Sequence, residues 1–216
     1  MQTRNLVCLA LTLWRSLTVV HAENSTYHNP VITGWHSDAS CIHSGEYFFC
    51  ATSSFLFFPG LPVYASKDLI NWKLVSHVWT RPSQVPNAGR NATWLNGGFF
   101  APTLRYHAGE YYLINVYLWD TSFDGSLLGT IYKTRNPFDS SSWSEPVFFT
   151  SPDIDCDIFW DDDGTTYLHT AGIRQQEINL QTGETTVPAY IWNGSKSRDS
   201  LRMQVGRGPR LIFSLR

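Results

Sequence analysis

Residues 38–53, DASCIHSGEYFFCATS, decide the fold, because their pattern returns twice along the chain. APTLRYHAGEYYLINV, residues 101–116, and DCDIFWDDDGTTYLHT, residues 155–170, share it. Each stretch holds a short strand, a turn that ends in glycine and an aromatic strand, which is typical of a β-hairpin. A second pair of strand-like runs follows each hairpin. The sequence therefore predicts three copies of a four-stranded antiparallel unit, and such a unit is a propeller blade.

The composition also indicates an all-β protein. Aromatic residues make up 15% and charged residues 16% of the sequence, and no stretch keeps a helical period for long. Blades bury their faces by stacking on one another, and a closed ring usually has ~4 to 8 of them. Three blades do not close a ring, so the sequence predicts an incomplete propeller.

The two ends of the chain differ from its middle. Residues 1–22 combine an early arginine, an apolar run and small residues up to Ala22, as a secretory signal peptide does. We expect a propeller domain over residues 23–193, followed by a basic tail over residues 194–216 that has no hairpin signal. The protein is expected to be secreted and extracellular, and its candidate N-glycosylation sites are Asn24, Asn91 and Asn193.

The charge balance bears on possible partners. The chain has 16 Lys and Arg against 18 Asp and Glu residues. This balance favours neither nucleic acid nor an anionic membrane as a partner, and no segment approaches the ~20 apolar residues of a membrane-spanning helix.

Three cysteines remain once the leader, which contains Cys8, is set aside. An odd number in an oxidising compartment permits one disulfide at most and leaves one free thiol. Cys41 and Cys50 flank the turn of the first predicted hairpin, so a cross-strand disulfide between them is one possibility. The spacing alone does not decide whether this bond forms.

The residue that opens each repeat occupies an equivalent position. In a propeller, the inner strand of each blade starts at the central channel. Asp38, Ala101 and Asp155 open the three repeats, so two aspartates from different blades are expected to converge on one pocket. The alternative is that Asp38, which precedes Ala-Ser, makes a local Asx turn.

Four ordered stretches resemble glycoside hydrolase family 43: NPVITGWHSDASC, SSFLFFPGLPVYASKDLINWKLVSH, GGFFAPTLRYHAGEYYL and DIDCDIFWDDDGTTYL. The resemblance runs from about Asn29 to Asn193. It implies a five-bladed β-propeller enzyme, of which this chain carries the first three blades. It also implies hydrolysis of xylosyl or arabinofuranosyl linkages of hemicellulose with inversion.

The family's motifs imply roles for two carboxylates. HSDAS is similar to the motif of the general base, which implies that role for Asp38. DCDIFWDDDG is similar to the motif of the carboxylate that orients the acid and tunes its pKa, which implies that role for Asp155. Cys156 and Asp157 replace the usual Pro and Ser of this motif, so the additional carboxylate of Asp157 could disturb the site.

The third carboxylate of the family is missing. The family's general acid is a glutamate that follows a segment like IWNG, and after IWNG this chain departs from the family. The nearest echo, GRGPRL, has Arg207, which cannot donate a proton at neutral pH. Glu177 and Glu184 match no acid motif. The chain is therefore either a hydrolase or a truncated, catalytically dead pseudoenzyme or carbohydrate-binding remnant. The tail after IWNG is interpreted as the product of a frameshift or a retained intron.

Aromatic side chains are expected to hold the sugar, an oligosaccharide derived from xylan or arabinoxylan. Family motifs carry this role to Trp35, Phe58 and Phe100, whereas Tyr111 and Tyr112 are expected to pack the blades. No cofactor and no metal site are expected. The DDDG turn lacks the spaced ligands of a calcium loop and suits a hairpin turn, and the histidines show no metal-ligand spacing.

Overall fold

The computed structural model describes residues 28–85, 97–118 and 127–192. Within these ranges, twelve strands form three four-stranded antiparallel sheets, each in chain order. The all-β class and the three blades of an incomplete propeller are thus confirmed. The predicted signal peptide, the basic tail and the three candidate glycosylation sites lie outside the described residues.

Each sheet is one predicted repeat. Blade 1 contains β1 (Ser40–Ser44), β2 (Tyr47–Ala51), β3 (Gly60–Ser66) and β4 (Lys73–Trp79). Blade 2 contains β5 (Gly98–His107), β6 (Glu110–Leu118), β7 (Leu127–Thr134) and β8 (Val147–Ser151). Blade 3 contains β9 (Asp157–Trp160), β10 (Thr166–Thr170), β11 (Arg174–Glu177) and β12 (Ala189–Tyr190). Two single-turn 3₁₀ helices, Pro82–Gln84 and Ser140–Ser142, join the described elements.

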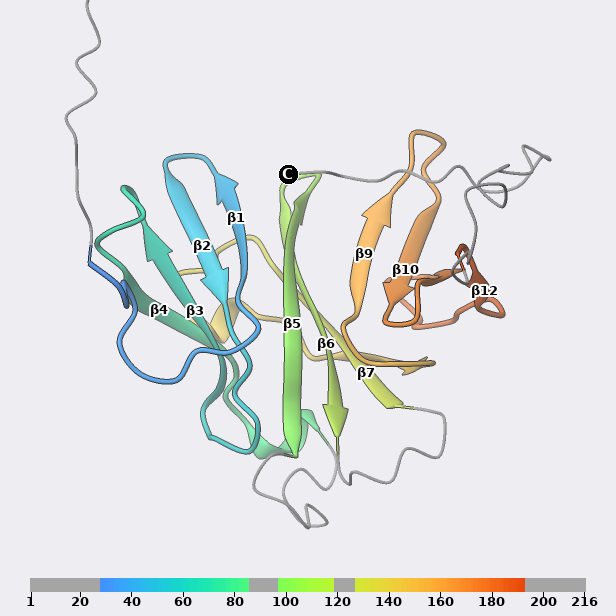
Figure 1. Cartoon of the computed structure of the whole chain (residues 1–216), viewed down its shortest axis with the longest axis horizontal. Coiled ribbons are helices and arrows are strands. Elements are labelled where there is room, and N and C mark those ends of the chain that lie inside the picture. The colour runs from blue at the N-terminus through green and yellow to red at the C-terminus, as the bar shows by residue number, and fades with distance from the viewer. Residues whose placement is uncertain (1–27, 86–96, 119–126, 193–216) are drawn as a thin grey trace, which may run out of the picture.

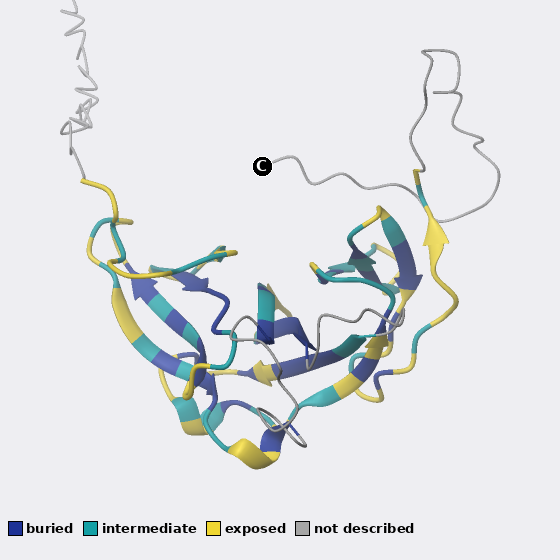
Figure 2. Ribbon diagram, turned by 60° about the horizontal axis from the view of Figure 1, so that its bottom comes forward, coloured by how far each residue is buried: buried dark blue, intermediate teal, exposed yellow. Residues whose placement is uncertain are grey.

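The first strands of the blades lie at the middle of the molecule. Figure 1 shows β5 at the centre, with β1 and β9 on the sides of their own sheets that face it. Figure 2 shows the sheets along an arc with one open side. Gly45, Gly109 and Gly164 form the turn after each first strand, with φ values of 61°, 85° and 87°. Glycine adopts this left-handed conformation without a steric cost, which explains why each repeat places one there.

Two hydrophobic clusters hold the blades together. Phe49 and Leu61 of blade 1 belong to one cluster with Leu113 of blade 2, whereas Ile114 belongs to a second cluster with Ile158 of blade 3. Successive residues of a strand point to opposite faces of a sheet. Strand β6 therefore buries both faces of blade 2, which makes blade 2 the structural centre of the described chain.

The predicted packing roles of two tyrosines are confirmed. Tyr111 is buried in the cluster between blades 1 and 2, and Tyr112 packs against the cluster between blades 2 and 3. Because adjacent residues of β6 face opposite clusters, Tyr111 and Tyr112 contribute one ring to each of the two interfaces of blade 2.

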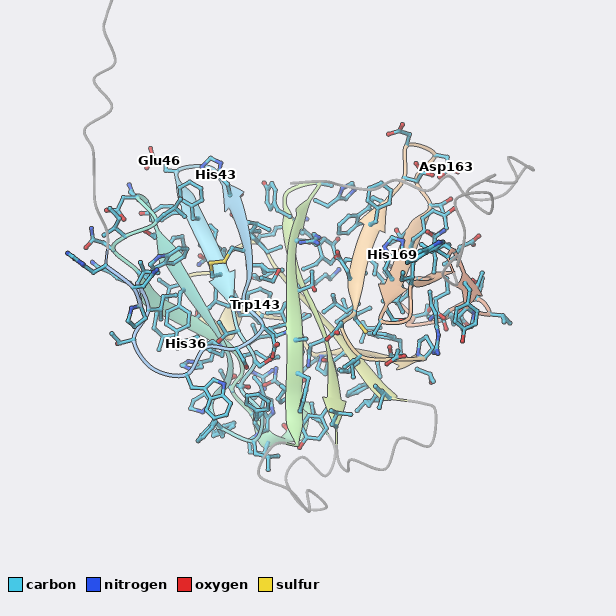
Figure 3. The ribbon with its side chains drawn as sticks, viewed as in Figure 1. His36, His43, Glu46, Trp143, Asp163 and His169 are labelled. Atoms are coloured by element: carbon cyan, nitrogen blue, oxygen red, sulfur yellow. A yellow bond between two sulfur atoms is a disulfide. The ribbon has the colours of Figure 1, made fainter. Side chains whose placement is uncertain are left out.

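A disulfide joins the first two strands of blade 1. Cys41 and Cys50 are directly opposite in the register of β1 and β2, and their sulfurs are bonded. Figure 3 shows this bond at the inner side of the blade. Cys156 is a free, buried cysteine. The cross-strand disulfide that the sequence permitted but did not decide is therefore present.

Candidate active site

The residues that open the repeats share an unusual backbone conformation. Asp38, Ala101 and Asp155 have φ values of 56°, 38° and 59°, all in the left-handed region. Residues other than glycine enter this region at a cost, and such positions gather at functional sites. The conformation recurs at one equivalent place in each blade. It is therefore a property of the repeat and puts Asp38 and Asp155 at matching positions on blades 1 and 3.

The two aspartates are electrostatically coupled. Partial burial raises the pKa of Asp155, and the negative charges of Asp38 and then Asp153 raise it further. A carboxylate disfavours a second nearby negative charge, so the charge of Asp38 acts on Asp155. The two predicted carboxylates, which come from blades 1 and 3, are thus close enough to influence one another.

Asp38 is held by a residue that sequence reasoning missed. The Ser53 hydroxyl donates to Asp38 Oδ2 at 2.6 Å, and the backbone N–H of Ala101 donates to Ser53 Oγ at 2.8 Å. The backbone N–H of Ser53 also donates to the carbonyl of Ser37 at 3.1 Å. Asp38 is thus no simple Asx turn, because its partner comes from 15 residues further along the chain.

The loop that carries Asp155 is fixed by neighbouring groups. The Ser151 hydroxyl donates to the carbonyl of Asp153 at 2.6 Å, and the N–H of Ala171 donates to the carbonyl of Ile154 at 3.0 Å. Arg174 donates to the carbonyl of Pro152 at 2.8 Å and lies 3.7 Å from Asp153 Oδ2. Sequence reasoning missed Asp153 and Arg174, because only the fold brings strand β11 to this loop.

The two departures from the family motif have structural partners of their own. Cys156 is fully buried, and burial raises the pKa of its thiol to about 12. Asp157 pairs with Arg105 of blade 2, with 2.5 Å between Oδ2 and Nη2. The charges that raise the pKa of Asp155 are those of Asp38 and Asp153, and the influence of Asp157 on the site stays a prediction.

The predicted aromatic platform is divided between two rows of rings. Trp35 is 80% exposed and meets Phe55 edge-on at 5.8 Å between ring centres, and Phe55 meets Phe100 at 5.0 Å. Phe58 is 50% exposed but meets the buried Trp79 at 4.9 Å. Trp35 and Phe100 thus lie in one row, joined by Phe55, which the sequence did not single out. Phe58 lies in the other.

One groove among the described residues lies away from the paired carboxylates. It has a volume of about 800 Å³ between blades 2 and 3, and neither Asp38 nor Asp155 lines it. Its lining includes Glu110, Tyr112, Glu177 and Glu184. Glu177 and Glu184, which match no acid motif, thus line this groove, whereas Asp38 and Asp155 do not.

The described residues hold neither a cluster of metal ligands nor a membrane-spanning helix. Within residues 28–85, 97–118 and 127–192, no three His, Cys, Asp or Glu side chains gather in a way that would hold a metal ion. No helix in this part of the chain is long and apolar enough to cross a bilayer.

A pH-dependence is expected from Asp155. Its raised pKa means that the folded chain holds this proton at a pH where the unfolded chain has released it. Stability therefore falls as pH rises through the window above the ordinary value of 3.8. Asp155→Asn is expected to remove this loss and to raise the urea midpoint at neutral pH.

Asp163→Asn is the matched control for that experiment. Hydrogen bonds from Thr165 lower the pKa of Asp163, which lies at the tip of the β9–β10 hairpin (Figure 3). This carboxylate stabilises the fold above its unfolded pKa, so its loss is expected to lower the midpoint at neutral pH. Shifts of the same sign in both variants would contradict the assignment.

Similarity to known proteins covers most of the described chain. The model of glycosyl hydrolases family 43 matches residues 27–199. The non-reducing end alpha-L-arabinofuranosidase BoGH43B of Bacteroides ovatus is 42% identical over 145 residues, 66% of this chain and 25% of that protein. A xylan 1,3-beta-xylosidase of a Vibrio species is 35% identical over 204 residues, 87% of this chain and 36% of that protein.

Solved structures agree with this result. The xylan beta-1,4-xylosidase from Bacillus halodurans is 32% identical and has a TM-score of 0.66, over 79% of this chain and 34% of that one. The chain thus spans between 25% and 36% of the length of these three proteins.

Proposed function

The chain belongs to glycosyl hydrolases family 43, and on this premise we propose that it serves the hydrolysis of xylosyl or arabinofuranosyl linkages in hemicellulose. The relatives are an arabinofuranosidase and xylosidases, which supports this substrate class. Asp38 is the general base, Asp155 tunes the pKa of the acid, and the ligand is an oligosaccharide derived from xylan or arabinoxylan.

The convergence of Asp38 and Asp155 carries this proposal. They occupy equivalent positions on blades 1 and 3, and the charge of Asp38 raises the pKa of Asp155. A pair of carboxylates that differ in environment is the arrangement that acid–base hydrolysis of a glycosidic bond requires. The exposed ring of Trp35 beside Phe55 offers an apolar face to a sugar.

The proposed reaction is the hydrolysis of a glycosidic bond with inversion at the anomeric carbon. Asp38 accepts a proton from a water molecule while the water oxygen bonds to the anomeric carbon, on the face opposite the leaving oxygen. The glycosidic C–O bond breaks, its electron pair passes to the leaving oxygen, and a general acid protonates that oxygen. The negative charge of Asp155 raises the pKa of that acid. The family's acid motif does not occur after IWNG in this sequence.

An activated substrate tests this function without the acid. Dinitrophenolate leaves without protonation, so 2,4-dinitrophenyl β-D-xyloside or α-L-arabinofuranoside needs the base alone. We expect the chain to release dinitrophenolate from one of these glycosides while it leaves xylobiose, which has a poor leaving group, uncleaved. Failure to turn over either aryl glycoside would reject the hydrolytic function for this chain.

A carbohydrate-binding remnant is the second candidate. The observation that favours it is the placement of Glu177 and Glu184 on the separate groove, where neither serves as the acid for Asp38. In that case, binding of xylo-oligosaccharides measured by calorimetry survives Asp38→Ala, and neither protein releases dinitrophenolate.

We also propose that the protein acts outside the cell. The Cys41–Cys50 disulfide supports this location, because disulfides persist in oxidising compartments. Detection of the protein in the culture medium, with its leader removed near Glu23, is the expected outcome.

A further inference from the structure

Ser53 is a buried serine whose hydroxyl contacts groups from two blades. It is 5% exposed and lies just after β2. Its hydroxyl contacts both the Asp38 carboxylate and the Ala101 N–H, so it connects the loop before β1 with blade 2. A buried hydroxyl in this position can fix the orientation of the carboxylate that it contacts.

The direction of the two hydrogen bonds is fixed by the atoms involved. A backbone N–H can only donate, so Ser53 Oγ accepts from Ala101. A serine hydroxyl has a single proton, and the geometry directs it to Asp38 Oδ2 at 2.6 Å. This donor fixes the orientation of the Asp38 carboxylate.

An irregularity in strand β5 lets the Ala101 N–H donate to Ser53 Oγ. The register of β5 with β6 shifts between Phe100 and Thr103, so Ala101 lies outside the regular ladder. Its left-handed φ of 38° matches that of Asp38 and Asp155 in the other repeats. The second blade thus contributes a backbone donor at the position where its neighbours contribute a carboxylate.

We propose that Ser53 is a positioning residue that orients the Asp38 carboxylate and links it to the Ala101 amide. This role in hydrolysis rests on the proposed function, but the link to Ala101 does not. Ser53 acts through Asp38.

Amide NMR tests the link without any need for activity. In a chain that keeps Ser53, Asp38→Asn is expected to shift the Ala101 amide resonance, because the group that Ser53 contacts changes. In a Ser53→Ala background the same change is expected to leave that resonance in place, while a Ser53→Thr background, which keeps a hydroxyl, retains the shift. Spectral dispersion checks that each variant folds. An Ala101 shift that persists in Ser53→Ala would overturn the proposal.

Ser54→Ala is the matched control. Ser54 is the neighbouring buried serine, and its hydroxyl accepts from the Leu61 N–H at 2.9 Å. Its loss removes a structural hydrogen bond of similar burial. The Ala101 shift is expected to survive in this variant, and its loss there would show that general loosening of the segment explains the result.

Kinetics with the aryl glycoside give a second reading. Ser53→Ala is expected to lower kcat, because the Asp38 carboxylate loses the donor that orients it. The loss is expected to be roughly 10- to 100-fold with KM unchanged, and Ser53→Thr is expected to restore kcat. Equal kcat values for Ser53→Ala and Ser54→Ala would contradict the role. If no chain turns over substrate, the NMR result still decides the proposal, and only the proposed function fails.

Discussion

Replacing Asp38 with alanine is expected to lower the hydrolysis of the 2,4-dinitrophenyl glycoside roughly 10²–10⁴-fold, the range that a positioned general base contributes. The leaving group needs no acid, so the whole loss reports on the activation of water. Trp35 and the other exposed rings are unaffected, and KM is therefore expected to change little. Initial rates measured by the absorbance of dinitrophenolate give the result.

Two further measurements make this result specific. Added azide, a small nucleophile that needs no base, is expected to restore part of the rate in Asp38→Ala and to form a glycosyl azide of inverted configuration. Asp163→Ala, a change of the same residue type at a hairpin tip, is expected to keep the original rate. Equal rates in Asp38→Ala and the unaltered chain would remove Asp38 from the mechanism.

Gly98→Ala is expected to cause a large loss of stability. Gly98 has a φ of 98°, and a Cβ atom there would lie 2.1 Å from the carbonyl oxygen of Phe55. Phe55 and Phe99 form a β-bridge at this place, which ties blade 1 to blade 2. The left-handed strain and the backbone clash together are expected to cost roughly 2–5 kcal/mol of unfolding free energy. Urea denaturation followed by tryptophan fluorescence measures the change.

Gly109→Ala separates the clash from the strain. Gly109 also has a positive φ, 85°, but a Cβ atom there meets no other atom within 4 Å. Its expected cost is only the conformational strain, roughly 1–2 kcal/mol. A cost for Gly98→Ala no greater than that for Gly109→Ala would contradict the close approach of the two blades.

The repeated hairpin made much of the fold predictable. Each strand pair is local, and the turn glycines such as Gly45 and Gly109 mark its centre, so the sequence pattern reports the blades directly. The position of Asp38 and Asp155 at the start of their repeats was predictable for the same reason. The left-handed φ that they share with Ala101 was not, because no turn glycine marks it.

The contacts between blades were beyond the reach of the sequence. Ser53 meets Asp38 only after the chain has closed a hairpin, and Arg174 meets the Asp155 loop only when β11 folds back on blade 3. Trp35 and Phe58 are both aromatic and close to family motifs, yet Trp35 contacts Phe55 whereas Phe58 contacts Trp79. Each of these contacts depends on how separate segments of the chain pack in the folded protein.

The stereochemistry of the first product tests the central claim most directly. Proton NMR during early turnover of 2,4-dinitrophenyl β-D-xyloside distinguishes the anomers of xylose before they interconvert. If Asp38 activates water for direct attack, then α-xylose appears first. The appearance of β-xylose first, or the absence of any free sugar from both the xyloside and the arabinofuranoside assay, would contradict the account.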